Sequence, residues 1–345
     1  MLSGRLAGTV PTTRGTVLNV TFYGVRGSTP CSGGEFARYG GNTSCVVLDG
    51  PGRSPIILDL GTGLRVYGAE FTRRDMDGAV GEPFRGTALL THLHWDHVQG
   101  IPFFAPLLSA GAELDLHAPI QAGEPLADVV RGFLSPPYFP VEIEALPGQI
   151  RFHDTEPGRF QVDDATVTAA WVPHVGPTFG YRVERDGRSV AYVSDHQQPT
   201  AGPTAVDPAV LELCRDVDLL IHDAQYDDAE FAQRPDWGHC TVDYAVEVAA
   251  ASGAHTLALF HHDPGHDDRR VDELLVSARE LADLRGVPEV IAAHEGLTVT
   301  LTPRVELARS VPDGRSGARE ASGATGQESV GVGADAAFPQ VAVGR

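Results

Sequence analysis

The sequence predicts an α+β layered sandwich built as one large domain. Short β-branched or apolar runs recur between Gly and Pro residues along most of the chain, whereas strong amphipathic helical patterns occur only in its last third. Strands and helices therefore alternate only toward the C-terminus, while a doubly wound sheet would alternate from the start. No Pro- and Ser-rich linker divides the body of the chain. One α+β domain is the simplest organisation.

Each predicted element has a local signature. Nine short segments have the composition of strands, and they are 18–23, 45–49, 56–59, 87–91, 166–172, 189–193, 217–221, 256–260 and 289–293. Residues 242–252 and 270–285 carry apolar side chains at three- and four-residue spacing, which is typical of helices packed on a core. We expect a flexible N-terminal segment at 1–17, a folded domain at 18–310 and a disordered, Gly- and Ala-rich tail at 311–345.

The composition excludes several classes of function. All 26 basic residues are Arg, and the absence of Lys excludes a Walker A loop and Schiff-base catalysis. The 46 acidic residues give a net charge of −20, which disfavours nonspecific binding to nucleic acid or anionic membranes. The four Cys form no C-x-x-C pair, and neither a signal peptide nor an apolar stretch of membrane-spanning length is recognisable. We expect a cytoplasmic protein with reduced thiols.

A histidine-rich motif, THLHWDH at residues 91–97, follows one of the predicted strands. Alternate residues leaving a strand share a face, so His92 and His94 point the same way, while Asp96 and His97 can reach a second point. Imidazole and carboxylate groups are preferred ligands of zinc and similar divalent ions. An exposed His-rich loop is the alternative, but burying these groups without a cation would leave polar atoms unsatisfied.

Further candidate ligands follow strand-like runs downstream. They are His174, Asp195 and either His261 or His262. A ligand at the carboxyl end of a strand sits on a rigid element at the sheet edge. Taken alone, each of these residues could be an ordinary hydrogen-bonded side chain. Together with residues 91–97, their order along the chain becomes specific.

This order, H-x-H-x-D-H followed by His, Asp and His, resembles the metallo-β-lactamase fold superfamily of binuclear hydrolases over about residues 18–302. The chain looks most like the branch that contains ribonuclease Z and the cyclic phosphodiesterases of phosphonate metabolism. The motifs that carry this similarity are GVRGS at 24–28, YGGNTS at 39–44, DLGTG at 59–63, IHDA at 221–224 and GHCT at 238–241. The resemblance implies a four-layer αββα sandwich and a metal-dependent hydrolase.

The resemblance also implies a role for each ligand. One metal ion would be bound by His92, His94 and His174, the other by Asp96, His97 and His261, and Asp195 would bridge the two. His261 is preferred over His262 because the last ligand of the family stands three residues before a proline, here Pro264. The expected cofactors are two divalent ions, with Zn²⁺ the first choice and Mn²⁺ the alternative.

The expected chemistry follows from charge. Two divalent ions, two carboxylates and a bridging hydroxide leave about one positive charge, which suits a substrate with one negative charge. We expect the metal-bridged hydroxide to attack a small phosphodiester, with a cyclic nucleotide as one candidate. The catalytic candidates are His239, as general acid, and Asp96. Alternatively, Thr241 caps a helix and His239 is merely exposed. Arg26 is a weaker candidate for a phosphate contact.

Three other functions compete with this interpretation. In ribonuclease Z an arm that grips tRNA is inserted between the third His and the bridging Asp, but only 20 residues separate His174 from Asp195 here, which disfavours tRNA 3′ processing. A thioester or lactone hydrolase would share the ligands but lack the GHCT-like segment. A non-catalytic metal-binding protein would have lost a ligand, and none is lost. We expect no membrane or large nucleic acid as partner, and segment 124–140 could be a lid or a homodimer contact.

Overall fold

The computed structural model describes residues 17–76, 82–121, 123–200 and 205–303. All of these residues belong to one compact unit, residues 1–304. The second unit, residues 305–345, contains none of the described residues. Residues 1–16 of the predicted flexible segment and the whole predicted tail at 311–345 also fall outside the described residues.

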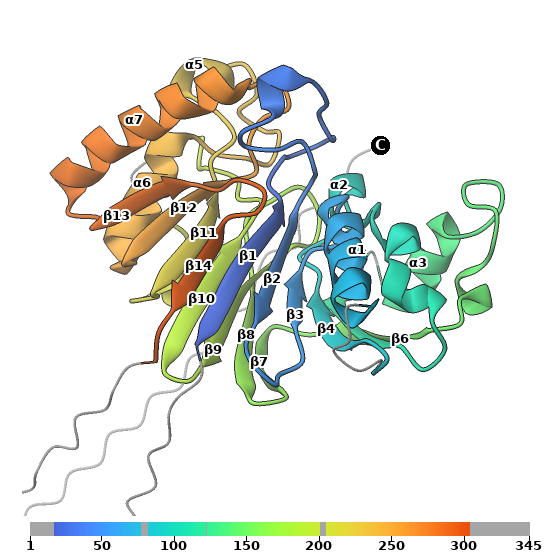
Figure 1. Ribbon diagram of the computed structural model, residues 1–345. Helices are drawn as coiled ribbons and strands as arrows, with labels where there is room; N and C mark the ends of the chain where they lie inside the picture. Colours follow the sequence, from blue (N-terminus) through green and yellow to red (C-terminus); the bar gives the residue numbers. More distant parts are fainter. Residues whose placement is uncertain (1–16, 77–81, 122, 201–204, 304–345) are drawn as a thin grey trace, which may run out of the picture. The chain divides into compact units, whose positions relative to one another are not determined.

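Two seven-stranded sheets form the centre of the compact unit (Figure 1). The first sheet contains, in spatial order, β14 (Thr298–Leu301), β1 (Leu18–Gly24), β2 (Cys45–Asp49), β3 (Ile56–Leu58), β4 (Arg85–Leu89), β5 (Glu113–Pro119) and β6 (Gln149–Thr155). The second contains β13 (Glu289–Ala292), β12 (Thr256–Phe260), β11 (Leu219–Asp223), β10 (Arg188–Val193), β9 (Phe179–Arg185), β8 (Ala165–Trp171) and β7 (Gly158–Val162). Strands β3 to β6 and β10 to β13 are parallel, and the other pairs are antiparallel.

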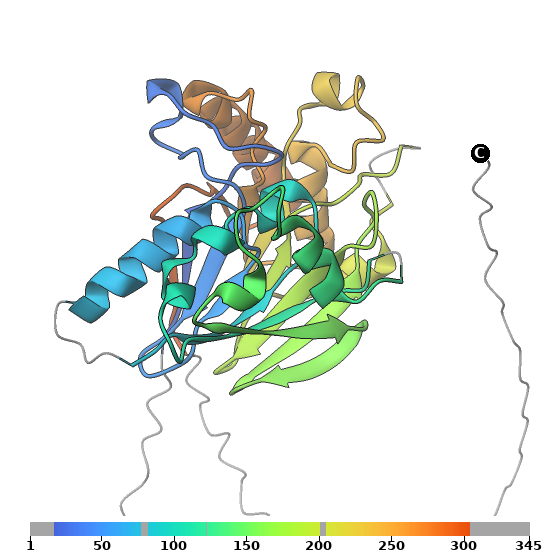
Figure 2. The same ribbon diagram turned by 90° about the vertical axis from the view of Figure 1, so that its right-hand side faces the viewer.

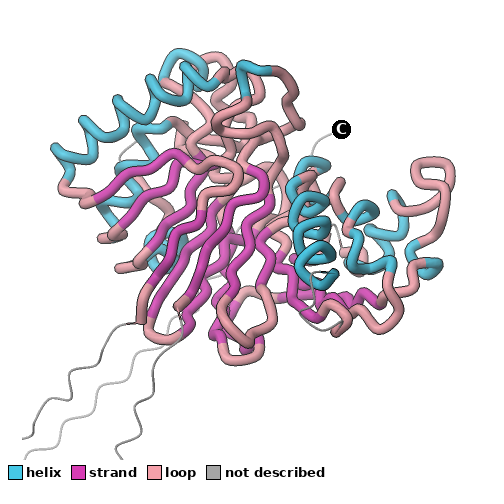
Figure 3. The backbone as a smooth tube through the Cα atoms, in the orientation of Figure 1, coloured by secondary structure: helices cyan, strands magenta, loops and turns pink. Residues whose placement is uncertain are grey.

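Helices cover the outer face of each sheet (Figures 2 and 3). Helices α1 (Gly63–Met76) and α3 (Leu126–Phe133) pack on the first sheet. Helices α4 (Pro208–Cys214), α6 (Val242–Ser252) and α7 (Asp268–Arg285) pack on the second. Shorter pieces are α2 (Trp95–Val98), α5 (Asp228–Phe231) and the 3₁₀ turns η1 (Gly34–Phe36), η2 (Ile101–Phe103), η3 (Ala105–Leu108) and η4 (Ile143–Ala145).

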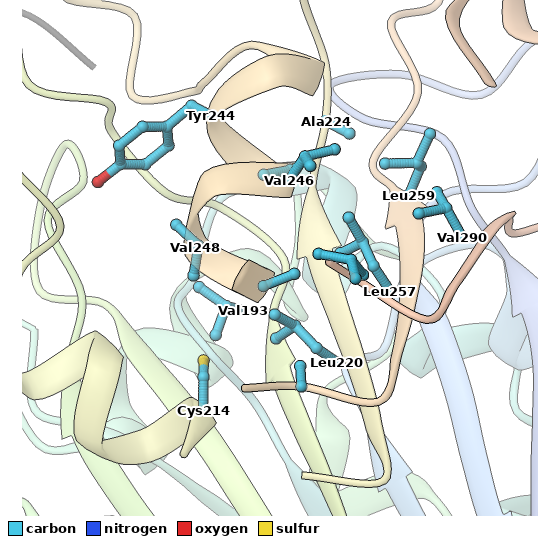
Figure 4. Close-up of a cluster of buried hydrophobic side chains, with 14 of the residues drawn as sticks. Val193, Cys214, Leu220, Ala224, Tyr244, Val246, Val248, Leu257, Leu259 and Val290 are labelled. Carbon is cyan, nitrogen blue, oxygen red and sulfur yellow. The ribbon is translucent and has the colours of Figure 1, made fainter. Parts of the chain in front are cut away.

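The strands bury both of their faces. In β12, Ala258 and Phe260 pack between the sheets, whereas Leu257 and Leu259 belong to the cluster beneath α6 and α7 (Figure 4). A strand buried on both sides has no polar face, which explains the continuous apolar runs in the sequence. A third cluster joins the first sheet to α1 and α3. The resulting order of helix, sheet, sheet and helix layers confirms the predicted four-layer αββα sandwich.

Capping residues fix the ends of the two predicted helices. The Thr241 hydroxyl accepts a hydrogen bond from the Tyr244 N–H at the start of α6, and the Asp267 carboxylate accepts one from the Arg270 N–H at the start of α7. Gly253 and Gly286 end these helices in the left-handed region, with φ of 73° and 79°. The sequence prediction placed α6 correctly and began α7 two residues late.

All nine predicted strands are present, with boundaries within two residues. The expectation that helices and strands alternate only toward the C-terminus is wrong, because α1 already follows β3. Its apolar residues Leu64, Tyr67 and Phe71 had the spacing of a helix, but Gly68 and polar neighbours weakened the signal. Strands such as β9 were missed because partly exposed charged residues, including Arg182 and Glu184, interrupt the apolar pattern. No helix in the described ranges combines the length and apolar character needed to cross a membrane.

Candidate metal centre

Segments that follow strands of both sheets meet to form the site. Residues 91–97 follow β4 of the first sheet, whereas His174, Asp195 and His261 follow β8, β10 and β12 of the second. Carboxyl ends of neighbouring parallel strands lie at one edge of a sheet, so side chains distant in sequence converge there. The two sheets together therefore supply the ligands.

The candidate ligands form overlapping groups whose ligand atoms lie within 4.8 Å of one another. The groups are His92, His94 and His174; His92, His97 and Asp195; Asp96, His97 and His261; and Asp195, His239 and His261. We call the first the open triad and the third the deep triad. The structure thus brings together all seven residues that the sequence suggested as ligands, with His239 beside them.

The deep triad is buried and rich in charge. Asp96 Oδ2 lies 3.1 Å from His261 Nε2 and 3.2 Å from His97 Nε2, and it accepts a hydrogen bond of 2.7 Å from the Ser28 N–H. Burial alone would lower the pKa of His97, but Asp96, Asp195 and Asp59 raise it well above its usual value. Burial also acts to lower the pKa of His261, but Asp195 and Asp96 raise it to about 9.

The open triad consists of three imidazoles, of which His94 is exposed. The His92 side chain is buried, and so is that of His174, whose Nε2 lies 3.2 Å from His94 Nδ1. Burial lowers the pKa of all three histidines, that of His174 to about 4, although the Asp195 carboxylate acts in the opposite direction. These side chains are thus neutral at pH 7, the form in which imidazole binds a metal.

Asp195 joins the two triads. Its Oδ1 lies 3.2 Å from His97 Nε2, and its Oδ2 lies 3.5 Å from His261 Nε2 and 3.8 Å from both His92 Nε2 and His174 Nε2. Although burial acts to raise its pKa, the surrounding histidines hold it well below the usual range. An ionised carboxylate in this position could contact ions held by either triad.

The residues fit divalent cations. Among the described residues, His92 Nε2, His97 Nε2 and Asp195 Oδ1 are buried polar atoms without a hydrogen-bond partner. Such atoms are rare because each costs free energy when it is removed from water. All three belong to one cluster, and imidazole nitrogen with carboxylate oxygen is a donor set suited to Zn²⁺ or Mn²⁺. Cations bound there would satisfy the three atoms together.

Asp59 holds the metal-binding segment in place. Its carboxylate lies 2.8 Å from His97 Nδ1 and accepts hydrogen bonds from the Thr91 N–H and the Tyr192 hydroxyl, at 2.7 and 2.9 Å. The backbone at Asp59 is left-handed, with φ of 59°, which is uncommon for a residue other than glycine. The nearby Gly61 must remain glycine, since a Cβ there would lie 2.4 Å from the Asp96 carbonyl oxygen.

Other ligands are oriented in the same way. His261 Nδ1 lies 2.9 Å from Gln225 Oε1, and His174 Nδ1 lies 2.7 Å from the Gly238 carbonyl oxygen. A partner on Nδ1 fixes the tautomer and directs Nε2 at the cluster. Sequence reasoning missed Gln225, although it directly follows the IHDA motif, and it missed Tyr192, for which the sequence offers no signal.

His239 is buried beside the ligand cluster and does not lie on the surface. Its residue is only 7% exposed, and its Nδ1 lies 2.9 Å from Asp223 Oδ2 and 3.8 Å from Asp195 Oδ2. The alternative in which His239 is an exposed residue next to a helix cap is therefore wrong, although Thr241 does cap α6. The contact between Nδ1 and Asp223 leaves Nε2 as the ring nitrogen without this partner.

Two other candidates lie outside the cluster. Arg26 is fully buried, and its guanidinium donates to the carbonyl oxygens of Gly40, Asp263 and His266 at 2.8, 3.2 and 2.7 Å. The expectation that Arg26 contacts a phosphate is thus wrong, because its side chain is used to join three loops. His262 Nε2 lies 2.9 Å from the Ala293 carbonyl oxygen, which turns this ring away from the cluster and leaves His261 as the candidate ligand.

Segment 124–140 borders the metal-binding motif. Leu126 and Val130 of α3 are buried against the first sheet, and the Phe133 ring packs edge-on against Trp95 at 5.8 Å. The helix is thus part of the packed domain. Its roles as a lid or as a homodimer contact stay predictions.

Comparison with known families agrees with this geometry. The β-lactamase superfamily domain matches residues 68–262, which is more than half of the chain. The chain belongs to the β-lactamase superfamily. This superfamily matches the predicted metallo-β-lactamase fold, and the protein is accordingly a metal-dependent hydrolase.

Curated relatives of this superfamily member include enzymes named ribonuclease Z. The one from Kineococcus radiotolerans is 28% identical over 291 residues, covering 73% of this chain and 89% of the relative. The one from Myxococcus xanthus is 30% identical over 255 residues, covering 62% of this chain and 80% of the relative. The predicted ribonuclease Z-like branch is confirmed. These names run against the expectation that large nucleic acids are not substrates.

Solved structures with the same fold share less sequence. The short form of human tRNase Z has a TM-score of 0.53 at 23% identity, covering 81% of this chain and 98% of that one. A diphosphatase of the PhnP family has a TM-score of 0.56 at 18% identity, covering 82% of this chain and 97% of that one. At such low sequence identities, these similarities show a shared fold and nothing more about function.

Proposed function

We propose that the protein is a binuclear metal-dependent phosphodiesterase that acts on small phosphodiesters. The observation that carries this proposal is the position of His239 between Asp223 and the ligand cluster. An alkoxide leaving group needs a proton, and an imidazole within reach of the reacting atoms can supply it. The Asp223 carboxylate would hold the ring in the tautomer and orientation for this transfer.

Divalent ions would be held by the two triads, with Asp195 shared between them. Bound there, such ions activate water and stabilise the negative charge that develops at phosphorus. The protein's own contribution is to hold the ligands rigidly through Asp59, Gln225 and the Gly238 carbonyl. Two ions and a preference for Zn²⁺ or Mn²⁺ are part of this proposal.

The preference for a small substrate rests on topology and charge. The 20 residues between His174 and Asp195 contain the hairpin of β9 and β10, which leaves no room for a tRNA-gripping arm at this place. Nucleic-acid binding depends on cations free to contact phosphate. Here exposed arginines such as Arg85, Arg131 and Arg215 are paired with acidic side chains.

Endonucleolytic processing of RNA is the second candidate, because several curated relatives are named ribonuclease Z. It would use the same metal centre and the same His239. Hydrolysis of a thioester or a lactone would use the same ligands. A thiolate departs more readily than an alkoxide, so a thioester has less need of a general acid, whereas the alkoxide of a lactone needs a proton as that of a phosphodiester does.

The test is a substrate panel on protein of defined metal content. We expect hydrolysis of bis(p-nitrophenyl) phosphate that is abolished by a chelator and restored by Zn²⁺ or Mn²⁺. Precursor tRNA, a lactone and a thioester are assayed in parallel. A metal-loaded protein that cleaves none of the phosphodiesters would overturn the proposal, and preferential cleavage of precursor tRNA would establish the second candidate.

A further inference from the structure

We propose that Trp95 and Trp237 form an aromatic rim that stacks on a planar base of the substrate, so that nucleotides are preferred among small phosphodiesters. This inference rests on the proposed function, since it concerns the same site. Both indoles are largely exposed, at 58% and 61%. Single exposed aromatic residues are common on protein surfaces, so their positions beside the metal-binding residues carry the argument.

Trp95 lies within the metal-binding motif. It stands between His94, the exposed member of the open triad, and Asp96 of the deep triad. The edge-on contact with Phe133 of α3 holds the indole on one side. Trp95 is therefore an exposed aromatic side chain that adjoins His94 in the chain and contacts Phe133.

Trp237 borders the open triad through its neighbour Gly238. The Gly238 carbonyl accepts from His174 Nδ1, and a Cβ at Gly238 would lie 2.4 Å from the His174 ring. The Arg234 guanidinium packs over the Trp237 ring at 5.3 Å and pairs with Asp263 at 3.3 Å. Arg234 also packs over Tyr226, whose ring lies 5.9 Å from that of His239. Arg234 thus packs on both Trp237 and Tyr226, and Tyr226 in turn lies beside His239.

Of the two triads, only the open triad reaches the surface. His94 is exposed, and Val175, next to His174, is 53% exposed, whereas all members of the deep triad are buried. With divalent ions held by the triads the centre would bind an anion, and exposed aromatic side chains beside it would suit a ligand that is charged at one end and planar at the other. A nucleotide has this combination of features, and every base offers a face for stacking.

The first experiment measures binding with a matched pair of ligands, AMP and ribose 5-phosphate. They share the phosphate and the ribose, and AMP carries adenine where ribose 5-phosphate carries its anomeric hydroxyl. The protein carries three tryptophans, and all measurements use a Trp171→Phe background, so that only Trp95 and Trp237 contribute tryptophan fluorescence. We expect AMP to quench the fluorescence and to bind about tenfold more tightly than ribose 5-phosphate. Trp95→Ala and Trp237→Ala should each reduce this ratio severalfold. Trp95→Phe should preserve it, as should the remote exposed control Leu284→Ala.

The second experiment measures catalysis with two esters that share a leaving group, thymidine 5′-(p-nitrophenyl phosphate) and methyl p-nitrophenyl phosphate. We expect a higher kcat/KM for the nucleotide ester, with the advantage residing in KM and reduced in both alanine variants. Equal affinities for AMP and ribose 5-phosphate would refute the proposal that the two tryptophans stack on a base. An equal loss of affinity for both ligands in the alanine variants would refute it as well. A protein that binds AMP preferentially but hydrolyses no phosphodiester would instead refute the proposed function alone.

Discussion

The deep and open triads use similar side chains in opposite environments. The deep triad combines a carboxylate with two histidines of raised pKa. Each of its members has a hydrogen-bond partner outside the cluster, namely Ser28, Asp59 or Gln225. The open triad contains only imidazoles of lowered pKa and reaches the surface at His94. The proposed function accordingly assigns the two triads different roles: the deep triad would hold charge within the fold, and the open triad would meet the substrate. We call this the proposed division of labour.

The largest effect is expected from removing the carboxylate of the deep triad. Asp96→Ala should lower kcat/KM for bis(p-nitrophenyl) phosphate about a thousandfold or more, because charge stabilisation by a metal contributes several kcal/mol. Loss of bound metal, measured by elemental analysis, should accompany the loss of activity. His94→Ala is the matched variant in the open triad, and its loss should be smaller. Equal losses in the two variants would contradict the proposed division of labour.

Removing the general acid should separate chemistry from metal binding. His239→Gln should lower kcat about 10²- to 10⁴-fold for esters with an alkoxide leaving group, which needs a proton. The loss should be much smaller for p-nitrophenolate, a stable leaving group, and the metal content should not change. A loss of the same size for both leaving groups would indicate that His239 serves as a ligand instead.

Neutralising the Asp59 carboxylate, which contacts His97 of the deep triad, should weaken metal binding. Asp59→Asn should reduce metal affinity about 10- to 100-fold, because the carboxylate orients His97 and raises its basicity. Asp272→Asn is the control, since its carboxylate accepts from Arg38 and Tyr39 and contacts no predicted ligand. Titration with a competing chelator measures both affinities. An unchanged affinity in Asp59→Asn would show that His97 needs no such support.

The smallest effect concerns a histidine that belongs to neither triad. His117 of β5 stacks between His153 and Phe160, and burial, with the nearby His153, lowers its pKa to about 4 against the opposing effect of Asp115. The unfolded chain takes up this proton near pH 6.5, so the group destabilises the fold increasingly as the pH falls from 6.5 to 4. His117→Phe should flatten the decline of Tm over this range. An identical slope in both proteins would show that His117 does not contribute.

The sequence by itself determined the layered fold and the set of side chains that converge on the metal centre. Both follow from local features, because continuous apolar runs mark doubly buried strands and residues at strand ends meet at one sheet edge. The sequence also predicts that no tRNA-gripping arm is inserted between His174 and Asp195, since only 20 residues separate them. Helix α1 carried a readable but weak pattern.

Only the tertiary structure decided how these side chains are used. Arg26 is bound to His266, 240 residues away, and His262 to Ala293, so no local pattern could show that both are turned away from the cluster. The same holds for Asp59 and Tyr192, which meet across 133 residues. Burial and hydrogen-bond partners arise from contacts distant in sequence, and they decide which of two chemically similar triads is deep and which is open.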